Sequence, residues 1–244
     1  MLKNKVVMIT GASKGLGREL ALQFAREGAR LAICARNGAS LKEVEMEVRA
    51  QGAEVAAVVA DVSVANDVDR FVSVAEEAFG RIDVLINNAS IFGPGPRLLA
   101  DYPEESFMEV LWVNTFNPFI ITKRVLPGML MRNEGSVINL TSEAGKTGFA
   151  EWGAYGISKF AVEGLTGTWA DELQETGVRI NMVDPGEMNT SMHEEAVPDC
   201  DYPLAEPHEH MDVFLYLSSD EAKDVSGKRF EAQEFTWNRG GGNE

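Results

Sequence analysis

The chain alternates short apolar runs rich in β-branched residues with longer helical patterns, and this alternation most limits how it can fold. Runs such as KVVMIT (5–10) and RLAICA (30–35) are each followed by a longer segment of helical periodicity, and the order repeats along the chain. Apolar strands separated by helices form parallel sheets that are covered on both faces, because each strand buries both of its sides. The sequence therefore predicts an α/β fold.

The predicted architecture is a Rossmann-like doubly wound sheet of about seven mostly parallel strands, with helices on both faces, in a single domain. This domain spans residues 1–237, and the polar, Gly-rich residues 238–244 are expected to form a flexible tail. Long helical stretches are predicted at about 104–131 and 152–175. Residues 187–209 are rich in Pro, Met, Glu and Asp, and are expected to form a lid or binding loop.

Composition argues against several classes of partner. The net charge of -16 disfavours nucleic acid, because phosphate binding needs a basic face. Cys34 and Cys200 belong to no CxxC motif, which indicates a reducing compartment. His208 and His210 have no third ligand in sight, so no metal is expected. No run approaches the ~20 apolar residues of a membrane span, and no signal peptide is recognisable. We expect a cytoplasmic protein with no membrane partner.

The segment TGASKGLG, residues 10–17, lies between the first strand and the first helix and carries a phosphate-binding pattern. Gly11 allows a tight turn, Gly15 lets backbone approach a pyrophosphate, and Gly17 lets the helix pack closely. The helix then supplies free N–H groups and the positive end of its dipole. The spacing differs from the usual Gly-x-Gly-x-x-Gly, but its position after the first strand predicts dinucleotide binding.

The second strand ends in ICARN, where many NAD proteins carry an acid for the ribose 2′-hydroxyl. Ala35 leaves this place uncharged, Arg36 follows it, and Lys14 lies in the glycine loop. Two cations near the expected ribose favour a 2′-phosphate and hence NADP(H), although two solvated charges remain the alternative. Asp61 closes the third strand and is a candidate partner for the adenine.

The segment EWGAYGISKF places Tyr155 and Lys159 four positions apart, which puts both side chains on one helix face. Alone, this pair is either ordinary surface or a phenol made more acidic by an ammonium group. A free tyrosine has a pKa of ~10, and lowering it by ~3 units takes roughly 4 kcal/mol. A close ammonium together with a positive nicotinamide in a water-poor site can supply this stabilisation.

Taken together, these motifs resemble the classical short-chain dehydrogenase/reductase family over about residues 4–230. The motifs that carry the resemblance are TGASKGLG, DV at 61–62, NNA at 87–89, Asn114, Ser142, YGISK at 155–159 and PGEMNT at 185–190. The resemblance implies that the catalytic residues are Asn114, Ser142, Tyr155 and Lys159. It implies cofactor binding by Gly11, Ser13, Lys14, Gly15, Leu16, Gly17, Arg36, Asp61, Val62, Asn87, Ala89, Tyr155, Lys159, Pro185, Gly186 and Thr190.

The family pattern also implies a role for each catalytic residue. Ser142 would bind the substrate carbonyl, and Tyr155 would give or take a proton as hydride is transferred. Lys159 would stabilise the phenolate and grip the nicotinamide ribose. Asn114 would hold a water that passes protons to the lysine. Pro118 has no N–H for the carbonyl of Asn114, so we predict a kinked helix and a free carbonyl there.

The resemblance thus implies an oxidoreductase that transfers hydride between NADP(H) and a small carbonyl or secondary alcohol. A 3-oxoacyl-thioester (acyl-carrier-protein) reductase and a catalytically silent NADP-binding sensor remain alternatives. A sugar-nucleotide epimerase shares the Tyr-x-x-x-Lys pair but usually needs a larger C-terminal region. The complete tetrad disfavours the sensor. Acyl carriers are acidic and prefer basic surfaces, whereas the lid segment is acidic, which favours a free small molecule.

Two further expectations concern surfaces. Glu143, beside Ser142, is either an ordinary loop carboxylate or, with Glu187, makes the substrate entrance negative. A homodimer or homotetramer is expected, as in many members of this family, because the two long helices carry apolar residues on more than one face. These residues include Phe116, Phe119, Leu165 and Trp169.

Overall fold

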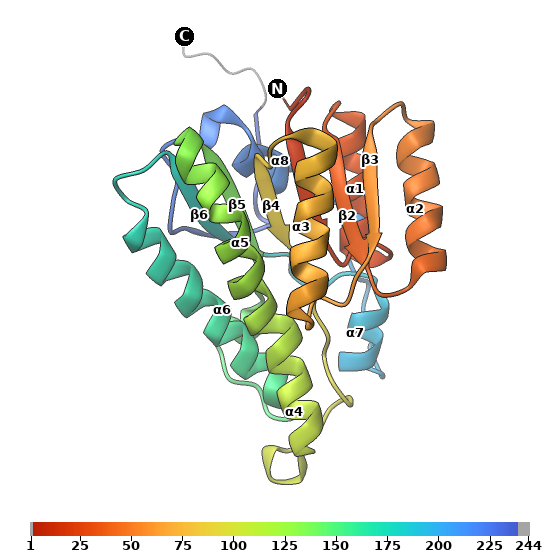
Figure 1. The fold of residues 1–244 in the computed structure, drawn as a ribbon. Helices are drawn as coiled ribbons and strands as arrows, with labels where there is room; N and C mark the ends of the chain where they lie inside the picture. The colour runs from red at the N-terminus through yellow and green to blue at the C-terminus, as the bar shows by residue number, and fades with distance from the viewer. Residues whose placement is uncertain (1, 239–244) are drawn as a thin grey trace.

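The structure, a computed structural model, describes residues 2–238 and contains the predicted doubly wound sheet. Its seven strands are all parallel and follow the order β3-β2-β1-β4-β5-β6-β7 (Figure 1). The strands are β1 (Val6–Thr10), β2 (Arg30–Ala35), β3 (Val55–Val59), β4 (Val84–Asn87), β5 (Gly135–Leu140), β6 (Val178–Asp184) and β7 (Arg229–Glu231). Connections run in opposite directions from β1 and β4, so a ligand crevice is expected between their carboxyl ends.

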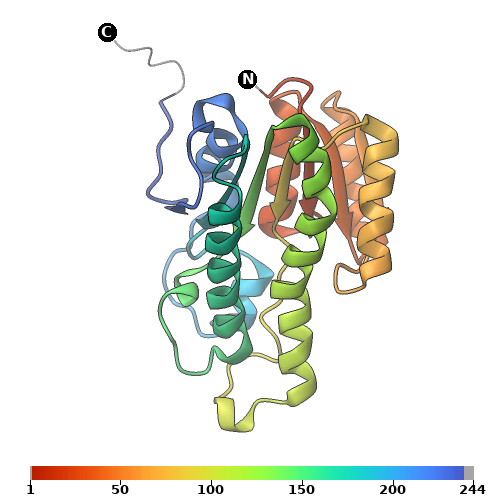
Figure 2. The ribbon, with the colours of Figure 1, turned by 60° about the vertical axis from the view of Figure 1, so that its left-hand side comes forward.

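Helices cover both faces of this sheet (Figure 1). One face is covered by α1 (Gly15–Arg26), α2 (Gly38–Ala50) and α8 (Asp212–Ser218). The other is covered by α3 (Ala65–Phe79), α5 (Asn117–Arg132) and α6 (Gly153–Glu172). Figure 2 shows α4 (Glu104–Leu111) continuing the line of α5 past the end of the sheet, alongside α6.

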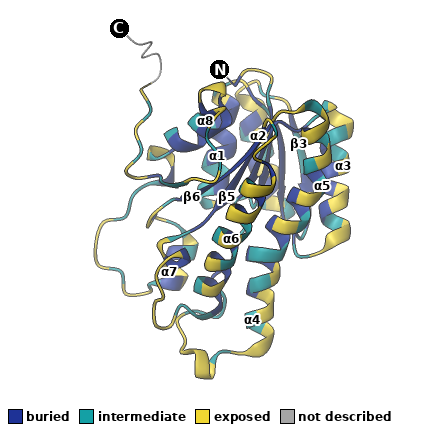
Figure 3. Cartoon of the chain, turned by 90° about the vertical axis from the view of Figure 1, so that its left-hand side faces the viewer, coloured by how far each residue is buried: buried dark blue, intermediate teal, exposed yellow. Residues whose placement is uncertain are grey.

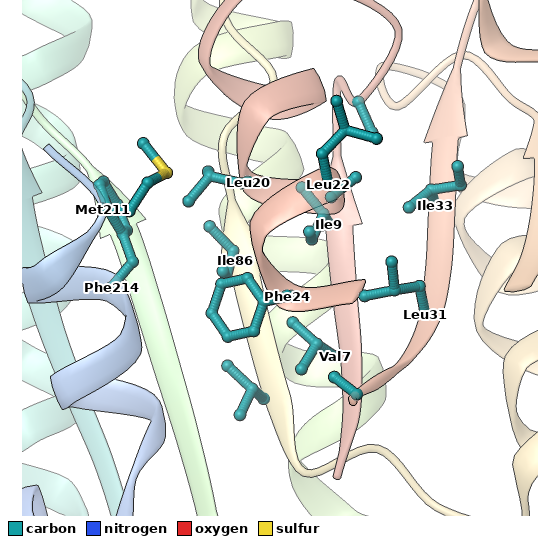
Figure 4. Packing of buried hydrophobic residues seen from close by; sticks show 14 of the residues in the cluster. Val7, Ile9, Leu20, Leu22, Phe24, Leu31, Ile33, Ile86, Met211 and Phe214 are labelled. Atoms are coloured by element: carbon teal, nitrogen blue, oxygen red, sulfur yellow. The ribbon is translucent and has the colours of Figure 1, made fainter. Parts of the chain in front are cut away.

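Alternating side chains of the strands enter two separate cores. Val7 and Ile9 of β1 pack against Leu20 and Phe24 of α1 in the first core (Figure 4). Met8, between them, enters the second core, under α3, α5 and α6. Every residue of β1 is therefore buried, which explains why this strand is apolar without alternation.

The long helix predicted at 104–131 is interrupted in its middle. Between α4 and α5 lies a π-helical turn, Trp112–Phe116, in which the N–H of Asn117 bonds to the carbonyl of Trp112, five residues back. Pro118 cannot donate a bond to the carbonyl of Asn114, and the wider turn accommodates this gap. The helix therefore has a π-turn where the kink was predicted, and Asn114 within this turn is 2% exposed.

The segment 187–209 has more regular structure than a simple loop. It contains the short helix α7 (Ser191–Ala196), a 3-10 turn (Pro207–Glu209) and a bridge between Met188 and Ala205. Figure 3 shows α7 beyond the ends of β5 and β6, with part of its surface buried. Of the expected tail, residues 239–244 lie outside the described residues. Among residues 2–238, no helix has the length and hydropathy of a membrane span.

Candidate active site

A cavity of about 900 Å³ lies at the carboxyl ends of the strands, between the turns that follow them and α7. It is lined by all but one of the cofactor residues expected from the sequence. The lining residues among them are Gly11, Ser13, Lys14, Gly15, Leu16, Gly17, Arg36, Asp61, Val62, Ala89, Tyr155, Lys159, Pro185, Gly186 and Thr190. The exception is Asn87.

Two glycines of the glycine turn, Gly11 and Gly17, leave no space for a side chain. A Cβ on Gly17 would lie 2.2 Å from the carbonyl oxygen of Gly11. Gly11 itself has a φ of +68°, and a Cβ there would lie 2.8 Å from the Cα of Ala89. The first turn of α1, which has free N–H groups, therefore lies against the cavity wall without obstruction. This cradle fits a pyrophosphate.

The NNA motif divides into a core residue and a cavity residue. Asn87 is 3% exposed and donates to the hydroxyl of Thr122 (3.2 Å) and the side-chain oxygen of Asn139 (2.7 Å), away from the cavity. Asn88 lines the cavity and donates to the carbonyls of Thr10 (2.9 Å) and Gly11 (3.1 Å). The structure therefore gives Asn88 the place beside the cradle that the sequence analysis gave to Asn87.

Two cations line the cavity: Arg36 directly follows β2, where the sequence places the adenosine ribose, and Lys14 lies in the glycine turn. Within residues 2–238 the only ionic partner of Arg36 is a distant one, Glu109, at 3.9 Å, and both side chains are more than half exposed. Such an exposed pair is weak, so the guanidinium can turn to a ligand. Lys14 donates to the hydroxyl of Ser191 at 2.8 Å, which links the glycine turn to α7. Asp61 accepts from the N–H and hydroxyl of Ser63.

Ser142, Tyr155 and Lys159 meet at the inner wall of the cavity. Ser142 follows β5, whereas Tyr155 and Lys159 lie one turn apart on α6 and are 8% and 3% exposed. The side chain of Ser142 interacts with the phenol of Tyr155 and lowers its pKa. Lys159 donates to the carbonyl of Leu140 at 3.0 Å, and its Nζ lies 5.3 Å from the Tyr155 ring centroid.

Burial dominates the acid–base behaviour of this pair. It raises the pKa of Tyr155 to about 12, against the opposing hydrogen bond from Ser142. Burial also lowers the pKa of Lys159 to about 8, against the opposing charge of Asp184. In the protein alone the pKa of Tyr155 is thus raised, because burial disfavours the phenolate. The lowering expected from Lys159 together with a bound nicotinamide concerns the cofactor complex and stays a prediction. At neutral pH Tyr155 carries its proton.

Asn114 supports the site from behind. Its side chain accepts from the N–H of Ile91 and donates to the carbonyl of the same residue, both at 2.9 Å. It also donates to the hydroxyl of Ser158 at 3.0 Å. The amide thus fixes the chain after β4 against α6, one residue before Lys159. Asn114 is not among the cavity-lining residues.

An aromatic wall around Tyr155 has no counterpart in the sequence motifs. Phe92 lies 5.3 Å from the Tyr155 ring and 5.4 Å from Trp152, between ring centroids. Phe149 lies 5.5 Å from Trp152, and all three line the cavity. Ala196 of α7 belongs to the same apolar cluster as Phe92 and Tyr155, with Met192 packed against it. The segment expected to be a lid therefore lies against the tyrosine.

Charged groups surround the turn after Ser142. Carboxylate oxygens of Glu143, Asp184 and Glu231 lie within 4.8 Å of one another. Lys146 and Arg229 form ion pairs with these acids, which balances much of their charge. The pair with Lys146 (2.8 Å) lowers the pKa of Glu143 and offsets its negative charge.

The hypothesis of a negative entrance is thus weakened at Glu143. Both Glu143 and Glu187 line the cavity, as it requires. Glu187 accepts a hydrogen bond from the hydroxyl of Tyr202 at 3.1 Å.

A family model described as short chain dehydrogenase matches residues 5–201. This chain belongs to that family. The family resemblance seen in the motifs is confirmed, and the protein is a member of this oxidoreductase family.

Known short chain dehydrogenases and reductases match nearly the whole chain. The 3-oxoacyl-[acyl-carrier-protein] reductase FabG of Thermotoga maritima is 34% identical over 237 residues, covering 93% of this chain and 95% of that protein. A structure described as a short chain dehydrogenase from Pseudomonas syringae has a TM-score of 0.91 at 36% identity, covering 95% and 96% of the two chains. Another, from Shigella flexneri 2a and complexed with NADP, has a TM-score of 0.90 at 30% identity, covering 95% and 98%.

Proposed function

We propose that this short chain dehydrogenase interconverts an uncharged ketone or aldehyde and its alcohol with NADP(H), using Tyr155 as the acid/base. The observation that carries this proposal is the meeting of Ser142, Tyr155 and Lys159 at the wall of a cavity whose other end is a glycine cradle. The cradle, with Arg36 after β2 and Lys14 in the glycine turn both lining the cavity, suits a dinucleotide that carries a 2′-phosphate. When bound there, NADPH supplies the hydride.

The protein residues control the proton in this reaction. Ser142 and Tyr155, whose side chains interact at the cavity wall, would both donate to the substrate oxygen. A pKa of about 12 keeps the proton on Tyr155 until negative charge develops on that oxygen. Lys159, buried beside the ring, would then stabilise the phenolate. The backbone of the π-turn at Asn114 is the proposed route for returning a proton through water to Lys159.

The surroundings of Tyr155 favour an apolar substrate. Phe92, Phe149 and Trp152 line the cavity on one side, and Met188 and Met192 line it from the lid segment. Aromatic and methionine side chains suit a hydrophobic or ring-bearing ketone. The likeness to an acyl-carrier-protein reductase supports the thioester alternative, but exposed acids in the lid segment, such as Glu194 and Glu195, would repel an acidic carrier.

A panel of substrates tests this proposal. NADPH consumption should be fastest with apolar ketones or aldehydes, and slower with 3-oxoacyl thioesters on acyl carrier protein. Faster turnover of the carrier-bound thioester would select the reductase alternative. NADPH binding without consumption of any carbonyl would select the silent sensor.

NADPH should bind more tightly than NADH. Arg36→Ala should weaken NADPH binding by about tenfold and leave NADH nearly unchanged, because only the 2′-phosphate loses a charged donor. Dissociation constants from cofactor fluorescence measure both. Arg26→Ala, at the opposite end of α1 from the cradle, is the matched control. Tighter binding of NADH to the parent protein would contradict the assignment of cofactor.

We also expect a homo-oligomer built on α4, α5 and α6. Trp112 of the π-turn, Phe119 of α5 and Phe160 of α6 are 42%, 37% and 47% exposed, and Phe119 stacks on Trp169. Light scattering should therefore give at least twice the chain mass of 26.7 kDa. Phe119→Glu should lower that mass, whereas Met46→Glu, on α2, should not. A parent protein of one chain mass would rule the oligomer out.

A further inference from the structure

Arg229, the first residue of β7, lies behind the proposed catalytic serine and forms an unusually complete set of contacts. Its Nη2 donates to the backbone carbonyl of Ser142 at 3.1 Å and to the carboxylate of Asp184 at 2.8 Å. Its Nε donates to Glu163 at 3.0 Å, and its Nη1 pairs with Glu231. One planar guanidinium therefore joins the ends of β5 and β6 to α6 and β7.

These contacts fix the turn that carries Ser142 on both sides. The oxygen of Glu163 that binds Arg229 also accepts from the hydroxyl of Thr141, at 2.7 Å. A Cβ on Gly145 would lie 2.5 Å from that hydroxyl and 2.6 Å from Glu163, so the 3-10 turn after Ser142 packs directly on this pair. Thr141, which precedes Ser142, binds Glu163, and the turn after Ser142 packs on this pair. The carbonyl of Ser142 itself binds Arg229.

The guanidinium also balances the charge nearest to the Tyr155–Lys159 pair. The side chain of Asp184 is 6% exposed, and its other oxygen accepts from the N–H of Gly186 at 2.9 Å. Burial raises the pKa of Asp184, and Arg229 opposes that rise. The negative charge of Asp184 in turn raises the pKa of both Tyr155 and Lys159.

We propose that Arg229 is a positioning residue for the reaction: it fixes the Ser142 backbone so that the serine hydroxyl stays in reach of Tyr155, and it neutralises Asp184 beneath them. This inference rests on the proposed function, because it gives Ser142 and Tyr155 their catalytic roles. A lysine offers no planar fork, so it can hold Asp184 but not Asp184, Glu163 and the Ser142 carbonyl together.

Arg229→Met and Arg229→Lys test the proposal, with turnover of the best carbonyl substrate, its KM, the NADPH dissociation constant and the melting temperature measured for each. A displaced serine turn should lower kcat by about 10- to 100-fold for Arg229→Met, with a smaller loss for Arg229→Lys. NADPH binding should change by less than about threefold, because none of the four hydrogen-bond partners of Arg229 is a proposed cofactor residue and Asp184 keeps its bond to the N–H of Gly186. Retention of full kcat by the folded Arg229→Lys variant would overturn the proposal.

Arg124→Met is the matched control. Arg124 also binds two carboxylates, Asp69 and Glu76, each at 2.8 Å, but it joins α5 to α3 away from the cavity. A merely structural role for Arg229 predicts that both methionine variants lose melting temperature and keep kcat. Equal kcat values for the two variants would therefore also overturn the proposal.

The pH profile separates positioning from general loss of structure. Around Arg229 and Asp184 the charged groups are Glu163 from α6, Glu231 from β7, and Glu143 and Lys146 from the turn after β5. Without Arg229, the less compensated Asp184 holds the proton of Lys159 more strongly. The alkaline fall of kcat/KM should move to higher pH in Arg229→Met and stay in place in Arg124→Met.

Asp184→Asn completes the test. When Arg229→Met is combined with Asp184→Asn, the pH profile of kcat/KM should move less than it does when Arg229→Met is made alone. A different result would show that the proposed role of Tyr155 is wrong: Tyr155→Phe would then keep its turnover, independently of the turnover of the Arg229 variants. An inactive Tyr155→Phe beside an unimpaired Arg229→Met would reject this inference alone.

Discussion

Tyr155→Phe should lower carbonyl turnover by at least about a hundredfold while NADPH binding changes by less than about threefold. The substitution removes one hydroxyl and keeps the ring that packs on Phe92 and Trp152. The loss should therefore fall on kcat, because that hydroxyl provides the proton for the substrate oxygen. Single-turnover rates with saturating NADPH, beside the NADPH dissociation constant, measure the two effects separately.

Tyr102→Phe is the control for this substitution. The hydroxyl of Tyr102 is buried without a hydrogen-bond partner in the described part of the chain, and Tyr102 does not line the cavity. Its removal should leave turnover unchanged. If Tyr155→Phe keeps most of its activity, Tyr155 is not the proton donor.

Lys159→Met should impair both turnover and cofactor binding. We expect kcat to fall by about a hundredfold, because the phenolate loses its neighbouring ammonium. The NADPH dissociation constant should rise by about tenfold if Lys159 also donates to the nicotinamide ribose. This double effect distinguishes Lys159 from Tyr155. An unchanged dissociation constant would remove the ribose contact, and an unchanged kcat would remove the lysine from the proton mechanism.

The same lysine predicts a pH dependence of stability. Its pKa is about 8 in the folded protein against an ordinary lysine value of 10.5, so the folded state loses the proton first. The burial of the ammonium therefore costs stability below about pH 8, and this cost fades as pH rises towards 10.5. The melting temperature of Lys159→Met relative to the parent should fall over that interval. A constant difference would contradict the lowered pKa.

The strands and the glycine turn were predictable because each depends on local pattern, whereas the four catalytic candidates came from the family resemblance and their roles stay predictions. Apolar runs and helical periods give the alternation of the fold, and the crowding at Gly17 leaves glycine as the residue that fits. The Pro118 argument located the interruption of the long helix, although hydrogen-bond geometry decided that it is a π-turn.

Other parts of the site depend on contacts between distant segments. Arg229 meets Ser142, Asp184 and Glu163 only because β7 pairs with β6, and no local motif marks that meeting. Asn87 and Asn88 are chemically identical, and only the direction in which each side chain leaves the end of β4 separates core from cavity. The raised pKa of Tyr155 likewise depends on burial, which the spacing of Tyr155 and Lys159 does not report.

Transfer of deuterium tests the central claim most directly. The protein would be incubated with NADPH deuterated at the transferring carbon and with each ketone or aldehyde of the panel, and the alcohols analysed by mass spectrometry. The account predicts one deuterium on the carbinol carbon of the product with the parent protein, and almost no product with Tyr155→Phe. Folded protein that binds NADPH and yields no deuterated alcohol from any carbonyl, thioesters included, would contradict it.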